Sequence, residues 1–459
     1  MQLAKSMLDR TGVIRFSLTA FSLFSLLIAN SQDNSPYSRY GLGNQFATTN
    51  IINRGMGGVS AAYSEFYSVN YANPASYARF QTIQEALSKK MRYGRVVLDV
   101  GVNGTSRTLV PPNSPESFTS SDLFFSHVYV GLPIRKNWGL VFGIRPISRI
   151  SYDVFRRDVM TDPSTGLPID SAVTQFRGNG GTFLPSIGTG FGTGNFSVGI
   201  NMGYLFGKKE TVTRRIPFND SVAYASSNHT TLSSFGDLFF NAGMQYHVDI
   251  NKDRLKFGLA GNWKQTIGGS QDIRRYTYSR NSSGGETIID SVYDETDVRG
   301  EMIYPSSITA GVIYERAPSE RVRGWTLGFD YVKNNWDQFR FFGGVDSVQS
   351  NHEIRIGGEL IPIGKPQRYG QAITYRAGFF TGRDYIHFKQ DLPVFGFSLG
   401  MGLPVVNYSR LSQNQFTVVN LAFEYARRGN DENVLKENLY RFSVGFNLTD
   451  LWFGKRRYE

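Results

Sequence analysis

The segment from Phe196 to Phe206 alternates large apolar residues with small or polar ones, and only Leu205 departs from the pattern. The apolar set is Phe196, Val198, Ile200, Met202, Tyr204 and Phe206. A period of two predicts a β-strand with one apolar face. About ten residues are enough for a tilted strand to cross a bilayer. This segment is therefore typical of a transmembrane strand.

The same pattern recurs along the chain and predicts about fourteen strands. We expect them at 93–106, 122–133, 137–155, 173–191, 195–207, 235–248, 254–268, 301–316, 323–334, 351–362, 367–381, 392–407, 415–427 and 438–449. Twelve or sixteen strands are the alternatives, if a long loop hides a hairpin or one segment is misassigned.

The connections between these segments test the strand count. Odd-numbered connections are long, as at 208–234 and 269–300, and even-numbered ones are short, as at 134–136 and 192–194, until 408–414. Outer-membrane barrels alternate long outer loops with short periplasmic turns in this way. A soluble β-sandwich or propeller would not require the asymmetry. We therefore predict an all-β transmembrane antiparallel β-barrel of about 14 strands.

Composition agrees with a barrel and excludes several kinds of site. The 459 residues include 14% aromatics, 49 glycines and no cysteine, and the mean hydropathy is −0.28. Without cysteine there is no disulfide, thiolate metal site or cysteine nucleophile, and we expect no cofactor or metal. The net charge of +11 comes from scattered basic residues. Outer-membrane lipid and lipopolysaccharide are therefore the expected anionic partners, not nucleic acid.

The N-terminus has the form of a secretory signal peptide. Three basic residues precede an apolar run at 16–28, which ends in Ala29-Asn30-Ser31. This order predicts a signal peptide at 1–31, because the run is too short for a membrane anchor. We expect a hatch segment at 32–90, a barrel at 91–459, and a location in the outer membrane of a Gram-negative (diderm) bacterium as an integral, multi-pass protein.

The segment at 32–90 does not alternate, yet it is too apolar and aromatic to be a solvated tail, so we expect it inside the barrel lumen. It contains Arg54-Gly55-Met56-Gly57-Gly58 and, within twenty residues, Asn73-Pro74-Ala75. A nucleotide-binding loop is a poor interpretation, because no strand precedes the glycines. They are more simply explained by close backbone packing.

With these motifs and the barrel that follows, the chain resembles the long-chain fatty acid transporter (FadL-like) family of outer-membrane proteins. The resemblance implies that the N-terminal segment is a hatch that plugs the lumen. It also implies that hydrophobic compounds leave sideways through a wall opening, made by a kink in the third barrel strand. Pro146 interrupts that strand here, so it is the candidate lateral gate. A simple bulge is the alternative.

The alternation also predicts which charged residues face the lumen. They are Arg145, Lys256, Lys264, Asp330, Glu353, Arg355, Glu359, Arg376 and Glu424. The set is nearly balanced in sign, which favours ion pairs that hold the hatch to the wall over an ion-selective pore.

Two loop features suggest other chemistry. Asp384, His387 and Asp391 form a local cluster without a second group beside it, so we do not expect an enzyme. Four Asp-Ser-small-apolar tripeptides fall on the predicted outer side. Their serines are candidate O-glycosylation sites, with an Asp-Ser turn as the alternative; they are Ser171, Ser221, Ser291 and Ser347.

Two functions fit these features. The first is passive uptake of small hydrophobic, fatty-acid-like compounds through the outer membrane. The alternative is a non-conducting structural or accessory subunit of an outer-membrane assembly or secretion complex, with other outer-membrane proteins as partners.

Overall fold

The computed structural model describes residues 34–84, 91–112, 116–161, 164–166, 168–218, 224–280, 285–405 and 415–452. The predicted signal peptide at 1–31 and Ser221 lie outside the described residues. In the described part, no helix has the length and apolar character needed to span a membrane.

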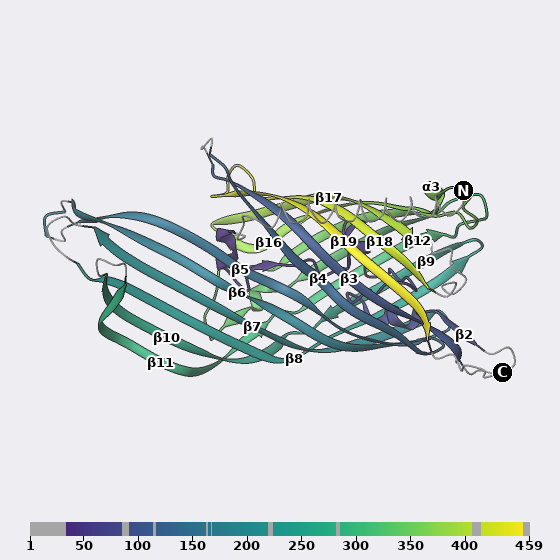
Figure 1. The fold of residues 1–459 in the computed structure, drawn as a ribbon, viewed down its shortest axis with the longest axis horizontal. Coiled ribbons are helices and arrows are strands. Elements are labelled where there is room, and N and C mark those ends of the chain that lie inside the picture. Colours follow the sequence, from purple (N-terminus) through teal and green to yellow (C-terminus); the bar gives the residue numbers. More distant parts are fainter. Residues whose placement is uncertain are drawn as a thin grey trace, which may run out of the picture.

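The wall is a closed antiparallel barrel of fourteen strands, as predicted (Figure 1). Two of the fourteen are interrupted, β9 with β10 and β11 with β12. The wall strands are β3 (Met91–Val110), β4 (Phe118–Arg135), β5 (Trp138–Thr161), β6 (Pro168–Thr193), β7 (Phe196–Phe218), β8 (Ser226–Ile250), β9 (Asp253–Asn262), β10 (Gln265–Arg280), β11 (Glu286–Tyr304), β12 (Ser307–Arg316), β13 (Gly324–Asn334), β15 (Asn351–Ile361), β16 (Thr374–Phe388), β17 (Gln390–Val405), β18 (Phe416–Arg428) and β19 (Lys436–Trp452). The last strand, β19, pairs with the first, β3, from Lys436 opposite Val110 to Trp452 opposite Gly94.

The remaining elements are short. They are η1 (Pro36–Arg39), β1 (Asn44–Gln45), α2 (Ile51–Arg54), η2 (Pro74–Arg79), β2 (Thr82–Gln84), η3 (Trp336–Gln338), β14 (Arg340–Phe341) and α3 (Tyr369–Ala372).

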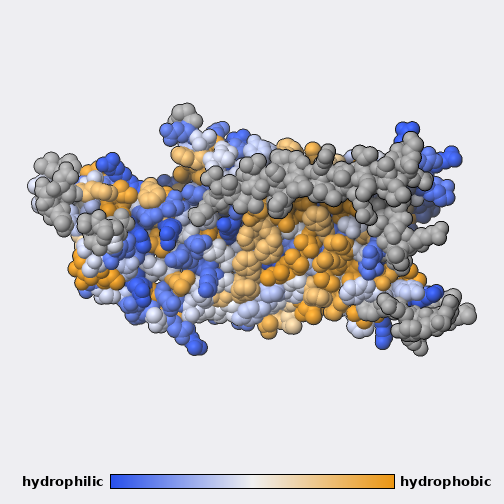
Figure 2. All heavy atoms as spheres, viewed as in Figure 1, coloured by the Kyte–Doolittle hydropathy of each residue, from blue (hydrophilic) through white to orange (hydrophobic). Residues whose placement is uncertain are grey.

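The two faces of β7 show the alternation expected from the sequence. The side chains at its even positions from Phe196 to Phe206 are all exposed, whereas Ser197 and Asn201 are buried toward the lumen. Figure 2 shows the resulting apolar surface across the middle of the molecule, with hydrophilic side chains toward both ends. Lipid would cover this surface, which explains why large apolar residues are tolerated there.

The outer connections differ from the prediction. The ranges 156–172, 208–234 and 269–300 were expected to be loops, but most of their residues continue the strands β5 to β8, β10 and β11. The connection expected at 382–391 shrinks to Lys389 between β16 and β17. Outside the bilayer no lipid requires apolar side chains on the outward face of a strand, so the alternation fades although the backbone ladder continues. Figure 1 shows the extended strands projecting to the left.

Residues 34–84 run through the lumen as the expected plug, which we call the hatch. Asparagine side chains fix its turns: Asn50 Oδ1 accepts the Asn53 N–H at 3.0 Å and begins α2, and Asn73 Oδ1 accepts the Ala75 N–H at 3.1 Å at the start of η2. Such side chains satisfy backbone donors that a short helix leaves free. At Gly57, φ is +66°, and a Cβ there would lie 2.9 Å from the Phe379 carbonyl oxygen. Only glycine allows this backbone contact between hatch and wall.

Candidate functional site: the hatch and the barrel lumen

Asp330, on β13, holds the middle of the hatch. Its Oδ2 accepts the backbone N–H groups of Ser60 at 2.7 Å and Ala61 at 3.0 Å. The carboxylate is fully buried, so these bonds form away from water. Hydrogen bonds to a charged acceptor are stronger than neutral ones, which makes Asp330 a firm anchor for the hatch.

Arg54, at the end of α2, connects the hatch to three wall strands. Its Nη1 donates to Asn103 Oδ1 at 2.6 Å and to Ser443 Oγ at 3.1 Å, and its Nη2 donates to Ser126 Oγ and to the Thr49 carbonyl, both at 3.3 Å. The residue is buried, and burial lowers the pKa of its guanidinium to about 10. The side chain therefore remains charged at neutral pH.

A second buried network lies nearer the end with the short turns. Arg376 donates to Glu359 at 3.0 Å and to Asn420 Oδ1 at 3.0 Å, and its other nitrogen reaches the Tyr67 hydroxyl of the hatch at 3.4 Å. Both members of the ion pair are buried. Breaking such a pair leaves an uncompensated charge, so Arg376 is fixed in place beside the hatch residue Tyr67.

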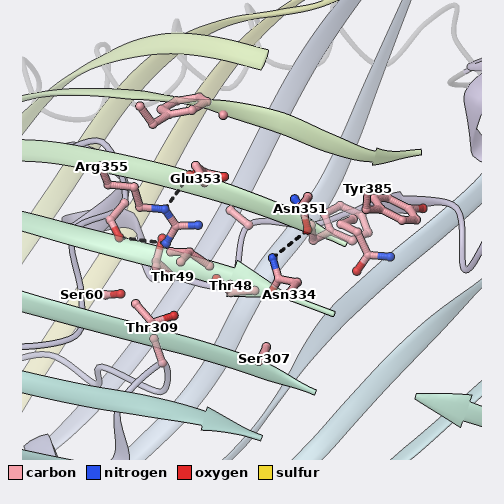
Figure 3. A pocket seen from close by; sticks show the side chains of 18 of the residues that line it. Thr48, Thr49, Ser60, Ser307, Thr309, Asn334, Asn351, Glu353, Arg355 and Tyr385 are labelled. Carbon is pink, nitrogen blue, oxygen red and sulfur yellow. Dashed lines mark hydrogen bonds and ion pairs between the residues drawn. The ribbon is translucent and has the colours of Figure 1, made fainter. Parts of the chain in front are cut away.

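The space left between hatch and wall is a cavity of about 380 Å³, lined by polar and charged side chains together with apolar and aromatic ones. Figure 3 shows Arg355 bonded to Glu353, and Asn334 bonded to Asn351, with Tyr385 nearby. Arg355 also donates to the Gly58 carbonyl at 3.2 Å, which joins the wall to the hatch. The paired charges thus face a cavity that also has apolar walls.

The wall is split between the outer halves of β4 and β5. The ladder between them runs from Arg135 opposite Trp138 to Val128 opposite Ile144 and ends there, although both strands continue. Pro146 lies two residues beyond the last pair, at a bulge in the pairing of β5 with β6. Figure 1 shows β4 and β5 diverging from this point. The structure thus places the proline at the end of the ladder. A proline has no N–H to donate to it.

The N-terminal residues of the hatch fill this split. The N–H groups of Ser35 and Phe46 donate to the β5 carbonyls of Ser151 at 3.0 Å and Ile147 at 2.9 Å. Asn34 reaches both edges, because its N–H meets Ser120 Oγ on β4 at 3.5 Å and its side chain donates to the Asp153 carbonyl on β5 at 3.3 Å.

Two side-chain contacts also close the split. Arg149 of β5 forms an ion pair with Asp122 of β4, and the ring of Phe46 stacks on that of Phe124 with 5.1 Å between the centroids. The split is therefore a closed seam.

The other predicted residues are distributed as follows. Gly55, Gly58, Asn73 and Pro74 lie in the hatch, and the predicted lumen charges lie on inward positions of the wall except for Lys264, which is exposed at the break between β9 and β10. This break interrupts the alternation from which its direction was inferred. Ser171, Ser291 and Ser347 lie in the outer part, on β6, on β11 and between β14 and β15.

The histidine cluster does not form a catalytic arrangement. His387 and Asp391 meet at 3.1 Å, but Asp384 instead accepts from Arg428 at 2.8 Å. No group of three or more metal-ligating side chains is found in the described ranges.

Sequence reasoning missed a network at the outer end of the lumen. Glu437 is buried and accepts from Arg107 at 2.6 Å, from Arg428 at 3.2 Å and from the Ser35 hydroxyl of the hatch at 2.6 Å. Alternate residues of β3, β18 and β19 face the lumen, and extending this alternation would have predicted that these side chains point inward. The predicted first and last strands stopped one residue short of Arg107 and Glu437.

The fold and the lumen define an integral outer-membrane β-barrel plugged by an N-terminal hatch. Among solved structures the chain is similar to the CymD monoaromatic hydrocarbon channel, with a TM-score of 0.51 and 14% identity over 89% of this chain and 98% of that one. It is also similar to a Pseudomonas aeruginosa FadL homologue, with a TM-score of 0.49 and 14% identity over 90% of this chain and 100% of that one. The Ralstonia pickettii toluene transporter TbuX is similar with a TM-score of 0.47 and 12% identity, over 87% of this chain and 98% of that one. The fourteen-stranded barrel with its N-terminal plug, a fold shared with the CymD channel, is the one that the resemblance to the FadL-like family implied.

Comparison with sequence families identifies the family to which the chain belongs. No curated protein matches the chain. The sequence model of the BamG family matches residues 13–459, and the chain belongs to that family.

Proposed function

We propose that the protein is a non-conducting structural or accessory subunit of a larger outer-membrane assembly in a Gram-negative bacterium. Its extracellular part would dock on other outer-membrane proteins. The proposal rests mainly on one observation, the apolar side chains that the outer strand extensions expose beyond the membrane.

These extensions are too long to be explained by the bilayer. β5 has 24 residues and β6 has 26, whereas a transmembrane strand needs about 9–11. The short turns mark the periplasmic side, so the extra length is extracellular. There Phe155 and Val159 are 64% and 66% exposed. Ile288, Ile289 and Val292 are also exposed; they lie on β11, at the other edge of the group of extended strands. Apolar groups gathered in water favour a protein contact.

The lumen supports the non-conducting part of the proposal. The hatch is bonded to the wall through Asp330, Arg54 and Arg376, and the remaining cavity is lined with charged side chains. An apolar solute would have to displace these paired charges from their partners, which is unfavourable.

Native mass spectrometry after gentle extraction from the native membrane tests the proposal. We expect a stable complex with other outer-membrane proteins. Changing Ile288, Ile289 and Val292 to threonine should release the chain as a monomer, while Val322→Thr, at an exposed periplasmic turn, should leave the complex intact. A wild-type monomer that carries small-molecule adducts would contradict the proposal.

A second candidate is passive uptake of small hydrophobic compounds, which the seam at Pro146 favours. In a wall that is already unpaired at one place, a lateral opening needs the N-terminal residues of the hatch to move and the ion pair between Arg149 and Asp122 to break. Uptake of labelled fatty acid and toluene by cells with and without the protein would test this function separately from complex formation.

A further inference from the structure

The cavity in the lumen carries more positive than negative charge. Seven arginines and four carboxylates line it. Five of the arginines have a carboxylate partner, as Arg107 with Glu437, Arg355 with Glu353, Arg383 with Asp391, Arg428 with Asp384 and Arg441 with Glu424. Arg54 and Arg145 have no carboxylate partner among the residues that the structure describes.

These two arginines meet at one hatch residue, Tyr71. The Arg145 guanidinium lies over the Tyr71 ring, 5.3 Å from its centroid. Burial raises the pKa of the Tyr71 hydroxyl, and the positive charges of Arg54 and Arg145 oppose part of this rise. Both charges therefore act on the same hydroxyl, and all three residues line the cavity.

Hydrogen-bond donors remain free at this place. Among the described residues, the Tyr71 hydroxyl and Arg54 Nε have no hydrogen-bond partner, and Tyr71 and Arg54 are only 3% and 2% exposed. Nε of Arg383 and Nε of Arg428 are also unpaired, but both of these guanidinium groups have a carboxylate partner. Buried polar atoms are nearly always paired, so each unpaired one requires an explanation. Two guanidinium charges without a counter-ion beside two free donors are best explained by an anion that binds there.

We propose that the hatch side of the cavity is a binding site for an oxyanion, a carboxylate or a phosphate, held between Arg54 and Arg145 with the Tyr71 hydroxyl as a further donor. The cavity volume of about 380 Å³ falls in the range of small-ligand sites, so an organic acid or phosphate ester fits as well as a free ion. The site needs no open pore and goes beyond the proposed docking function.

Isothermal titration calorimetry on the purified full-length mature protein in maltoside detergent tests the site. Sodium octanoate and inorganic phosphate are the two anionic probes, and octan-1-ol is the neutral probe with the same chain as octanoate. We expect at least one anion to bind saturably and octan-1-ol to show only partition into the micelle. Octanoate alone would identify an amphiphilic acid, and phosphate alone a free oxyanion or ester.

Variants separate the site from the general charge of the lumen. Arg145→Gln should weaken binding at least tenfold, and Tyr71→Phe, which keeps the ring packing, about threefold. Arg383→Gln is the matched control: it lies in the same cavity but already has Asp391 as its partner, so its affinity should stay within twofold of wild type.

Circular dichroism and heat-modifiability on gels would verify that each variant forms the barrel. The proposal is overturned if neither anion binds, or if Arg145→Gln and Arg383→Gln have equal affinities. Because the measurement uses the isolated protein, its failure would leave the docking proposal untouched.

Discussion

The Asp330 anchor can be tested by substitution. Asp330→Ala removes the acceptor for the N–H groups of Ser60 and Ala61 and leaves both donors buried. Two hydrogen bonds to a charged group contribute about 3–6 kcal/mol together. Removing a buried carboxylate also relieves its desolvation, which offsets roughly a third to a half of this. We expect the hatch to lose about 2–3 kcal/mol of local stability, which corresponds to about a 30- to 150-fold change in its opening equilibrium.

Hydrogen exchange detected by mass spectrometry measures this opening in the folded barrel. Peptides covering 55–65 should exchange about 30- to 150-fold faster in Asp330→Ala, while peptides from the wall strands keep their protection. Asp330→Asn should have a smaller effect, because its amide oxygen still accepts both bonds without the charge. Asp249→Ala is a control, since Asp249 is exposed near the periplasmic end of β8.

Unchanged exchange at 55–65 in Asp330→Ala would refute this reasoning. It would mean that the hatch is held by its packing against the wall and that the buried hydrogen bonds add nothing measurable. Equal acceleration in every part of the barrel would point to global destabilisation, and the anchor would then have no local role.

Three further predictions concern the seam, the hatch and processing. If the seam at Pro146 is a gate, Pro146→Val restores an N–H to the strand and should reduce uptake of labelled fatty acid and toluene; uptake equal to wild type for both would remove the gate. Burial, and then the charge of Glu359, raises the pKa of Glu65 in the hatch to about 8. The folded state therefore holds a proton that the unfolded state releases near its ordinary pKa, and the hatch should lose stability as the pH rises toward 8. Glu65→Gln should abolish this trend in exchange rates at 55–65, whereas a trend that persists would assign it to another group. Intact mass of the protein from its native host should correspond to cleavage after Ser31 plus added sugar at one or more of Ser171, Ser221, Ser291 and Ser347. A mass without sugar would exclude the modification.

The strand count, the closure of the wall and the direction of most side chains in it could be predicted from the sequence alone. The bilayer requires apolar groups on one face of each strand, and the lumen favours small or polar groups on the other. These two environments therefore explain why the residues of β7 alternate with a period of two from Phe196 to Phe206. The hatch was predictable for a related reason, because an apolar segment that does not alternate has no other place to be buried.

The outer part of the protein was not predictable in this way. Beyond the membrane no lipid requires apolar groups on the outward faces of β5 and β8, so the sequence pattern fades there and predicts loops where the structure has strands. The same limit applies within the wall at Lys264. The strand is interrupted between β9 and β10, so the side chain of Lys264 does not point in the direction that counting alternate residues along the sequence predicts.

The contacts that close the lumen were decided by the tertiary structure. The Ser35 hydroxyl meets Glu437 at 2.6 Å across 402 residues of chain, and Arg54 reaches Ser443 across 389. No local pattern encodes such pairings, since they depend on the curvature of the barrel and on the path of the hatch through it. The sequence by itself determined that there is a barrel with a plug, because lipid on one face and the lumen on the other select the residue types of each strand independently. Which charges in the lumen form ion pairs, and which two arginines of the cavity lack a carboxylate partner among the described residues, depends on how the fourteen strands close around the hatch.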